Sequence, residues 1–377
     1  MSVSIKKCEN YDIENVEKAT RELFAHQGFD CELFGGKKVL VKPNLVSAVT
    51  PDAAATVHPS VVEACCKIIK ELGGIVTIAE SPGSLYTVPV LKNLYKTTGI
   101  AQAAENSGVA LNYDLESEGI NYDKGEVSKF FEIIKPVLEC DVIFDIAKLK
   151  SHTLTLMTAN VKNLFGTIPG VFKAEQHARY KNQDVFQKSL IDLACFHCEN
   201  KKVVCLTDAV IAMEGNGPGG GTPKKIGCLL ASNNIFECDV FCAAIINQSP
   251  EEVKMLRYAS ERGLIPKNPL ENIEQNGDSY KNFVAKDFVQ PDTKLKKWFD
   301  VIPKSLSPKP KINKNKCVGC GKCAAVCPQK TVSIIKINDR QIAKINYKKC
   351  IHCFCCQELC PIHAIDVHKN LIFKIVK

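Results

Sequence analysis

Short apolar runs alternate with amphipathic stretches over the first 265 residues. The apolar runs predict strands over 39–46, 74–81, 109–114, 141–149, 202–213 and 226–233. The stretches between them repeat apolar residues at helical spacing and predict helices over 58–74, 88–108, 184–198, 235–247 and 250–262, the second of them broken near Gly99. Because strands that alternate with helices pack as a layered sheet, this region predicts an α/β domain with a mostly parallel sheet.

Polar side chains gather where four of the predicted strands end. They are Lys42 and Asn44; Glu80, Ser81 and Gly83; Lys148, Lys150 and His152; and Asp208, Glu214, Asn216 and Gly217. In open parallel sheets, ligands bind outside the carboxyl ends of the strands. The pattern therefore predicts a binding site there, although strand ends also carry polar residues simply because they meet water.

The segment AKLKSHTLTLMTANVKNLFG (147–166) contains three lysines and no acidic residue. A bound phosphate or carboxylate could supply the missing charge, and a lysine from the first strand could join the site. The predicted anion-binding residues are Lys42, Lys148, Lys150 and Lys162. The candidate general acids or bases are His152 and His177. A solvent-exposed basic face is the simpler alternative.

Two other kinds of site remain open for the same region. Histidines and carboxylates could hold zinc, iron or manganese, although no close-spaced ligand motif joins them: His58, His152, His177, Asp208, Glu214 and Asp239. The glycine-rich stretch MEGNGPGGGTPKK (213–225) matches neither a dinucleotide-binding fingerprint nor a Walker loop. Its glycines permit either close backbone approach to a ligand or a flexible turn.

A basic, proline-containing stretch follows the α/β region. The formal net charge of the chain is +8, and residues 291–316 hold eight Lys against two Asp, mixed with Pro, Ser and Asn. This composition predicts a solvated Lys/Pro-rich linker over 291–314, between an α/β domain at 1–290 and a second domain at 315–377. Docking of an acidic redox partner is the minority interpretation of the lysines.

The chain has 20 cysteines, and their distribution divides it. In a long chain without a secretion signal, so many cysteines argue for reduced thiols and metal ligation. Eleven precede residue 243, many in apolar runs where cysteine acts as a small buried hydrophobe; the other nine crowd between 317 and 360. Thiols in such numbers oxidise easily, which fits an anaerobic source. We expect a cytoplasmic protein, because the amino-terminal segment does not resemble a signal peptide and the best apolar run (203–213) is too short to span a bilayer.

Two loops in the last part of the chain share the spacing C-x2-C-x2-C-x3-C-P. Three thiolates at i, i+3 and i+6 can reach one cubane, and in two-cluster ferredoxins the cysteine before proline ligates the other cluster. The spacing predicts two [4Fe–4S] clusters, one held by Cys317, Cys320, Cys323 and Cys360 and the other by Cys350, Cys353, Cys356 and Cys327. Cys355 is left over. Structural zinc, the competing metal, explains neither the third cysteine nor the Cys-Pro pairs.

Both parts of the chain resemble known families. The cysteine loops, with a predicted hairpin at 331–347 between them, form a small α+β module similar to a bacterial-type ferredoxin over about 315–370. This resemblance implies one-electron transfer. KVLVKPNLV, TVHPSVVEA, AESPG, AKLKSHTLTLMTANVKNLFGTIPG and TDAVIAMEGNGPGGGTPKKIGCLLAS resemble the family called domain of unknown function 362, over about 1–265. That family is often fused to a ferredoxin module, and its likeness implies a fold but no reaction.

An electron-transfer module fused to a lysine-lined site favours an iron–sulfur redox protein. We expect it to relay single electrons between two sites. One is a carrier, which would be a redox partner protein, and the other is an anionic substrate or second centre in the α/β domain. The alternative is a ferredoxin-like carrier whose large domain only docks partners. A nucleic-acid-binding protein with structural clusters is disfavoured because no recognised binding motif accompanies the lysines, and no membrane partner is expected.

Overall fold

The structure is a computed structural model that describes residues 2–180, 182–291, 309–337, 339–360 and 362–368, apart from the side chains of residues 171, 174, 177–179, 358 and 367. Most of the predicted linker, residues 292–308, therefore lies outside the described residues.

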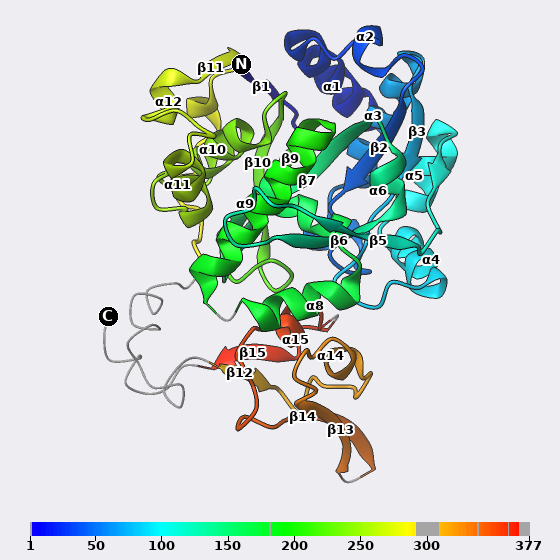
Figure 1. The fold of residues 1–377 in the computed structure, drawn as a ribbon, viewed down its shortest axis with the longest axis vertical. Coiled ribbons are helices and arrows are strands. Elements are labelled where there is room, and N and C mark those ends of the chain that lie inside the picture. Colours follow the sequence, from blue (N-terminus) through cyan, green and yellow to red (C-terminus); the bar gives the residue numbers. More distant parts are fainter. Residues whose placement is uncertain (1, 181, 292–308, 338, 361, 369–377) are drawn as a thin grey trace.

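One sheet organises the larger domain (Figure 1). Within the described ranges, its strands lie in the order β11-β1-β10-β9-β7-β2-β3-β4, and β8 pairs with β7. The parallel centre consists of β4 (Ala110–Leu111), β3 (Ile75–Ile78), β2 (Lys38–Pro43), β7 (Val142–His152) and β9 (Lys202–Glu214). The other strands are β10 (Thr222–Ser232), antiparallel to β9 and to β1 (Ser2–Lys7); β11 (Glu274–Gly277), parallel to β1; and β8 (Leu156–Thr158), antiparallel to β7. The expected α/β fold with a mostly parallel sheet is confirmed.

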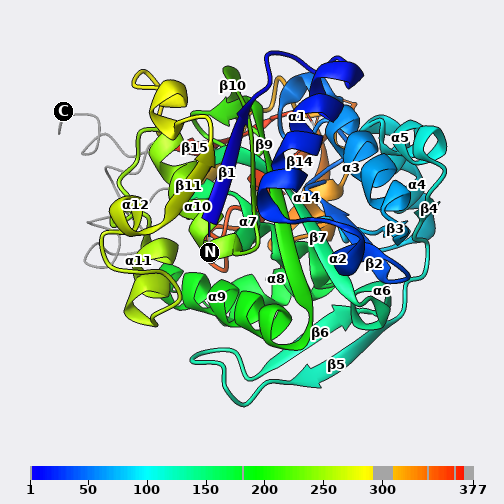
Figure 2. The same ribbon diagram turned by 90° about the horizontal axis from the view of Figure 1, so that it is seen from above.

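Helices cover both faces of this sheet (Figure 2). Alternate residues of the central strands pack on opposite sides, as Val39 and Val41 do against Leu40, because side chains of a strand alternate between its faces. One face carries α1 (Ile13–Gln27), α3 (Pro59–Glu71), α4 (Val88–Thr97) and α5 (Ile100–Ser107); the other carries α9 (Gln183–Asn200), α10 (Ile235–Ile245) and α11 (Lys254–Glu261). Of the helices that can be described, none is long and apolar enough to cross a membrane.

Shorter elements connect these layers. They are α2 (Cys31–Phe34), η1 (Pro51–Ala53), the hairpin of β5 (Ser117–Asn121) and β6 (Phe130–Ile134), α6 (Lys135–Glu139), α7 (Asn160–Asn163), η2 (Leu164–Thr167), α8 (Gly170–Arg179), α12 (Pro269–Asn272) and η3 (Tyr280–Phe283). The helix predicted over 88–108 breaks at Gly99, whose φ of 77° is the left-handed conformation that glycine adopts readily. The strand predicted to end at 149 continues to His152, fully buried along its length.

The small module packs below the α/β domain, with α15 (Cys355–Glu358) beside α8 (Figure 1). Its strands form two antiparallel pairs, β12 (Lys309–Ile312) with β15 (Ile365–His368) and β13 (Val332–Ile337) with β14 (Arg340–Ile345). The second pair is the hairpin expected between the cysteine loops. A short helix contains the third cysteine of the spacing in each loop, Cys323 in α14 (Lys322–Ala325) and Cys356 in α15.

Candidate functional site

A buried ion pair closes the end of β2. Lys42 is 1% exposed, and its Nζ lies 2.5 Å from Oε2 of Glu80, which follows β3. The same ammonium group donates to Oδ1 of Asn163 at 2.8 Å and to the carbonyl of Pro43 at 3.2 Å. Burial raises the pKa of Glu80, an effect that the neighbouring lysines oppose. The strand ends therefore meet as the sequence predicted, but this lysine is already neutralised by the chain itself.

A second buried pair joins β7 to β9. Lys148 Nζ lies 2.9 Å from Oδ2 of Asp208, its neighbour across the two strands, and donates to the hydroxyl of Tyr11 at 2.7 Å. That hydroxyl donates to Asp208 Oδ1 at 2.9 Å, and the ring of His58 stacks on the Tyr11 ring at 3.7 Å. Burial lowers the pKa of Lys148 and brings that of His58 to about 4. The inference that no acid balances the lysines of 147–166 is wrong for Lys148, because its partner comes from another strand.

Lys150 and His152 are also held by neighbouring segments. Lys150 donates to Oδ1 of Asn44 and to the carbonyl of Ala55, both at 2.6 Å. The backbone amides of Leu154 and Thr155 donate to Nδ1 of His152 at 3.0 and 3.4 Å, which stabilises the turn between β7 and β8. These contacts give both side chains a structural role at the end of β7.

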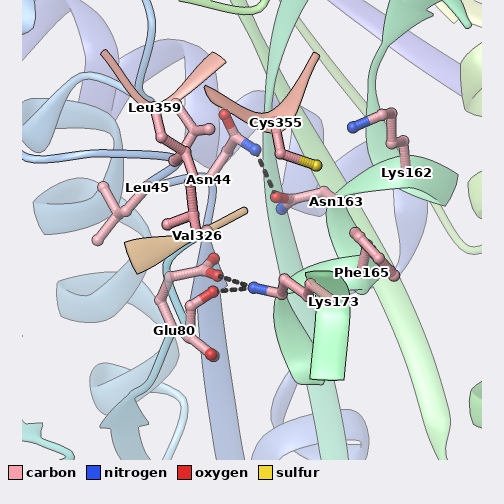
Figure 3. Close-up of a pocket in the computed structure, with 14 residues that line it drawn as sticks. Asn44, Leu45, Glu80, Lys162, Asn163, Phe165, Lys173, Val326, Cys355 and Leu359 are labelled. Atoms are coloured by element: carbon pink, nitrogen blue, oxygen red, sulfur yellow. Dashed lines mark hydrogen bonds and ion pairs between the residues drawn. The ribbon is translucent and has the colours of Figure 1, made fainter. Parts of the chain in front are cut away.

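A pocket with about 90 Å³ of free space lies between the two domains (Figure 3). One water needs roughly 10–15 Å³ on this measure, so the pocket has room for a small polyatomic ligand. The α/β domain contributes Asn44, Leu45, Val46, Glu80, Ser81, Gly83, Lys162, Asn163, Phe165, Gly166 and Lys173, and the small module contributes Val326, Cys355 and Leu359. Of the four predicted anion-binding lysines, only Lys162 belongs to this wall.

Lys173 is the pocket residue that sequence reasoning missed. It reaches the pocket from α8, donates to the carbonyls of Ser81 and Pro82, and places Nζ 3.9 Å from Oε1 of Glu80 (Figure 3). Burial lowers its pKa to about 7, against the opposing effect of Glu80. No motif surrounds Lys173 in the sequence; only the approach of α8 to the loop after β3 identifies it. The nearby candidate His177 lies in α8, but its side chain is outside the described residues.

Two small residues shape the pocket floor. A Cβ added to Gly166 would lie 2.2 Å from Glu80 Oε1 and 2.6 Å from Lys42 Nζ, so only glycine lets η2 approach the ion pair this closely. The hydroxyl of Ser81 is fully buried and has no hydrogen-bond partner among the described residues. A buried hydroxyl without a partner is unfavourable, and a ligand in the pocket could supply one.

The small module contains two further cavities that are lined by cysteines. One is lined by Cys317, Cys320, Cys323 and Cys360, and the other by Cys327, Cys350, Cys353 and Cys356, with Cys355 as a fifth cysteine in its wall. Apart from Cys355, these are the two crossed sets that the spacing predicts. Backbone amides of Ala343, Ala364 and Thr331 donate to the sulfurs of Cys317, Cys360 and Cys327 at 3.2–3.4 Å. Four thiols converging on an otherwise largely apolar cavity suit the four-thiolate ligation of a cubane.

The two loops share one backbone conformation. Gly319 and Gly321 have φ values of 66° and 77°, and the equivalent positions of the second loop, His352 and Phe354, have 56° and 62°. Non-glycine residues seldom adopt this left-handed conformation. The repeated sequence spacing thus corresponds to a repeated fold of the chain around each cavity.

Cys355, the cysteine left over by the spacing, lines both the second cysteine cavity and the pocket between the domains. The other two module residues in the pocket wall, Val326 and Leu359, directly precede Cys327 and Cys360. The pocket therefore shares a wall with the loops that hold the predicted ligands.

The alternative metal site in the α/β domain finds no support in the described residues. Among the described side chains of the α/β domain, which do not include that of His177, no group of three or more His, Cys, Asp or Glu is arranged to hold a single metal ion. Nδ1 of His58 accepts the amide of Ser60 at the start of α3, and Asp239 accepts the amides of Asn160 and Val161 at the start of α7. These side chains are used as helix caps.

Comparison with known proteins gives matches to both parts of the chain. The family described as Domain of unknown function (DUF362) matches residues 39–244, more than half of the chain, and the family described as 4Fe-4S dicluster domain matches residues 310–367. Thylakoid-associated protein sll1697 of Synechocystis sp. is 28% identical over 272 residues, 70% of this chain and 80% of that protein. Among solved structures, the lactate racemase apoprotein of Thermoanaerobacterium thermosaccharolyticum matches with a TM-score of 0.42 and 13% identity, over 65% of this chain and 57% of that one. The matched region thus spans less than two thirds of that enzyme.

Proposed function

The chain belongs to the DUF362 family and carries a 4Fe-4S dicluster domain with two [4Fe–4S] clusters, and we propose that it is an iron–sulfur oxidoreductase whose substrate is a small anion bound in the pocket between the domains. The dicluster domain supports the electron-transfer part of this function. The α/β domain then provides the binding site.

The proposal depends on one observation: Cys355 lines both the pocket between the domains and the second cysteine cavity. A ligand in the pocket would contact the same loop that surrounds the second cysteine cavity. When bound, the clusters supply one-electron transfer. Electron exchange requires close approach of the two reactants, and the packing of the module against the α/β domain supplies it.

The charges of the pocket wall favour an anion. The wall contains two lysines, Lys162 and Lys173, and one carboxylate, Glu80, which also pairs with Lys42 behind the wall. A carboxylate or phosphate group could bind to these lysines through charge-assisted hydrogen bonds. The hydroxyl of Ser81, which has no partner in the part of the chain that the structure describes, can donate to the same group.

Lys173 is also better placed than His152 to donate a proton. Its pKa of about 7 gives it both protonation states near neutral pH. His152 Nδ1 already accepts two backbone amides. We therefore assign to Lys173 the roles of binding the ligand and donating a proton. We assign to His152 the role of stabilising the turn after β7.

The competing function is a ferredoxin-like carrier whose α/β domain takes no part in chemistry. The internal pairing of Lys42, Lys148 and Lys150 favours it, because these predicted anion-binding residues have partners within the chain. The pocket distinguishes the two functions, since a pure docking domain needs no ligand there.

The test is anaerobic reconstitution followed by a screen of small carboxylates and phosphates against the reduced protein, with re-oxidation followed by visible absorbance. We expect one compound class to re-oxidise the clusters, and Lys162→Gln to slow this at least tenfold. Lys18→Gln, an exposed lysine of α1, is the matched control. If no compound is reduced, or if Lys162→Gln and Lys18→Gln behave alike, the domain is a docking domain.

A further inference from the structure

The positive charge of the protein is concentrated in the small module. Residues 309–368 contain eleven Lys and Arg against three Asp and Glu, a formal charge of +8 that equals the charge of the whole chain. The remainder of the chain is therefore balanced. A strongly charged, compact module steers the approach of oppositely charged partners and repels those of like charge.

The two cysteine cavities face different surroundings. The second shares Cys355 with the pocket between the domains. Both are lined by residues of the small module, but the wall of the first includes two exposed apolar side chains, Val318 at 62% and Ile362 at 38%. Cys320 and Lys322 in the same wall are exposed as well. The first cavity thus has an outer wall that the other described residues leave exposed.

Three exposed basic residues belong to this wall or to segments next to it. Lys316 is exposed and directly precedes Cys317, and Lys322 is part of the wall itself. Arg340, exposed on β14, donates to the carbonyl of Asn315 at 3.4 Å and so lies beside the same loop. We define Lys316, Val318, Lys322, Arg340 and Ile362 as the carrier surface. An apolar centre with a charged rim is the usual composition of a transient protein interface.

We propose that an acidic electron-carrier protein docks on the carrier surface, over the outer wall of the first cysteine cavity. Its carboxylates pair with the basic rim, and its apolar contact residues cover Val318 and Ile362. The charge of the module selects the carrier, and the short path from the surface to the loop of Cys317–Cys323 makes this the site of electron exchange. The proposal goes beyond the pocket function and holds even if the pocket binds nothing.

The test measures binding of the reconstituted, full-length protein to a flavodoxin of net negative charge, by calorimetry at low and high salt. We expect Lys316→Glu/Lys322→Glu to raise Kd at least tenfold at low salt and to flatten its salt dependence, because exposed charges act within a Debye length of about 10 Å at 0.1 M salt. Val318→Ser should raise Kd without changing the salt dependence.

The matched control is Lys18→Glu/Lys37→Glu, two exposed lysines near α1 and α2 at the opposite end of the molecule (Figure 1). It has the same change of net charge and should leave Kd within about twofold, since long-range steering is weak at this distance. Iron and sulfide contents of all variants confirm that the clusters are loaded. Equal effects of the two charge reversals, or binding of a single-stranded oligonucleotide in place of the flavodoxin, would overturn the proposal. Its failure leaves substrate-dependent re-oxidation untouched, so the two ideas are tested separately.

Discussion

Lys173 reaches the pocket from α8. It faces the carboxylate of Glu80, a residue of the loop after β3. Three charged groups surround its amine: Glu80, which favours the charged form, and Lys42 and Lys162, which oppose it. Burial has the largest effect and lowers the pKa of Lys173 to about 7. Its charge therefore changes near neutral pH, whereas an exposed lysine would stay protonated.

The first prediction concerns the pH dependence of anion binding. Protonated Lys173 attracts an anion and neutral Lys173 does not, so affinity for sulfate, which does not titrate here, should fall as pH rises through about 7. Calorimetry between about pH 6 and about pH 8 should show at least a several-fold loss. Lys173→Arg stays charged over this range and should abolish the dependence. An unchanged profile in Lys173→Arg would assign the titration to another group.

The second prediction concerns the close approach of η2 to the buried ion pair. In Gly166→Ala the new methyl group would overlap Glu80 Oε1 and Lys42 Nζ, so the pair must move, and we expect its contact to be disrupted. Disrupting a buried pair costs roughly 3–5 kcal/mol, and denaturant unfolding should show a loss of that order. Gly220→Ala is the control, because its nearest neighbour would be 3.3 Å away. A loss below about 1 kcal/mol in Gly166→Ala would mean that the pair can shift without cost.

At the scale of elements, the cysteine loops could be predicted from sequence and the lysine site only in part. The loops repeat a local spacing, and their fold follows from residues a few positions apart. The lysines depend on which strands are neighbours: Lys148 meets Asp208 only because β7 lies beside β9. The clustering of polar residues at the strand ends was predictable, because the carboxyl ends of parallel strands lie at the same edge of a sheet. Lys173 was not, since the position of α8 is a property of the packed domain.

The third prediction separates the two cysteine sets. Cys327→Ser removes a ligand from the second cavity although it belongs to the first loop, so we expect loss of one cluster, to about four irons per chain, with the other retained. Cys355→Ser should keep both clusters, because each cavity has four other thiols. Iron and sulfide analysis with low-temperature EPR measures both. If Cys355→Ser lost a cluster and Cys327→Ser kept both, Cys355 would be the fourth ligand of the second cluster and Cys327 would not be a ligand.

At the scale of the whole molecule, the pocket exists only where the module meets the α/β domain. A Cβ added to Gly83 would lie 2.7 Å from Cδ2 of Leu359, so the loop after β3 and the second cysteine loop are in direct contact. Neither domain lines the pocket alone. The proposed function therefore depends on the contact between the α/β domain and the small module.

The last prediction tests that dependence. In Gly83→Trp the indole has no room beside Leu359 and should force the domains apart, because packed interfaces do not accommodate large insertions without movement. Both clusters should remain, since no α/β residue lines either cysteine cavity. We expect a larger radius of gyration in small-angle X-ray scattering and at least tenfold weaker ligand-dependent re-oxidation, while flavodoxin binding at the carrier surface is unchanged. Ile75→Trp, at a position already 60% exposed, should alter none of these. If the domains separate and re-oxidation keeps its normal rate, the substrate binds outside the interface. If re-oxidation is lost when the domains separate, the contact between the domains is needed to form the binding site.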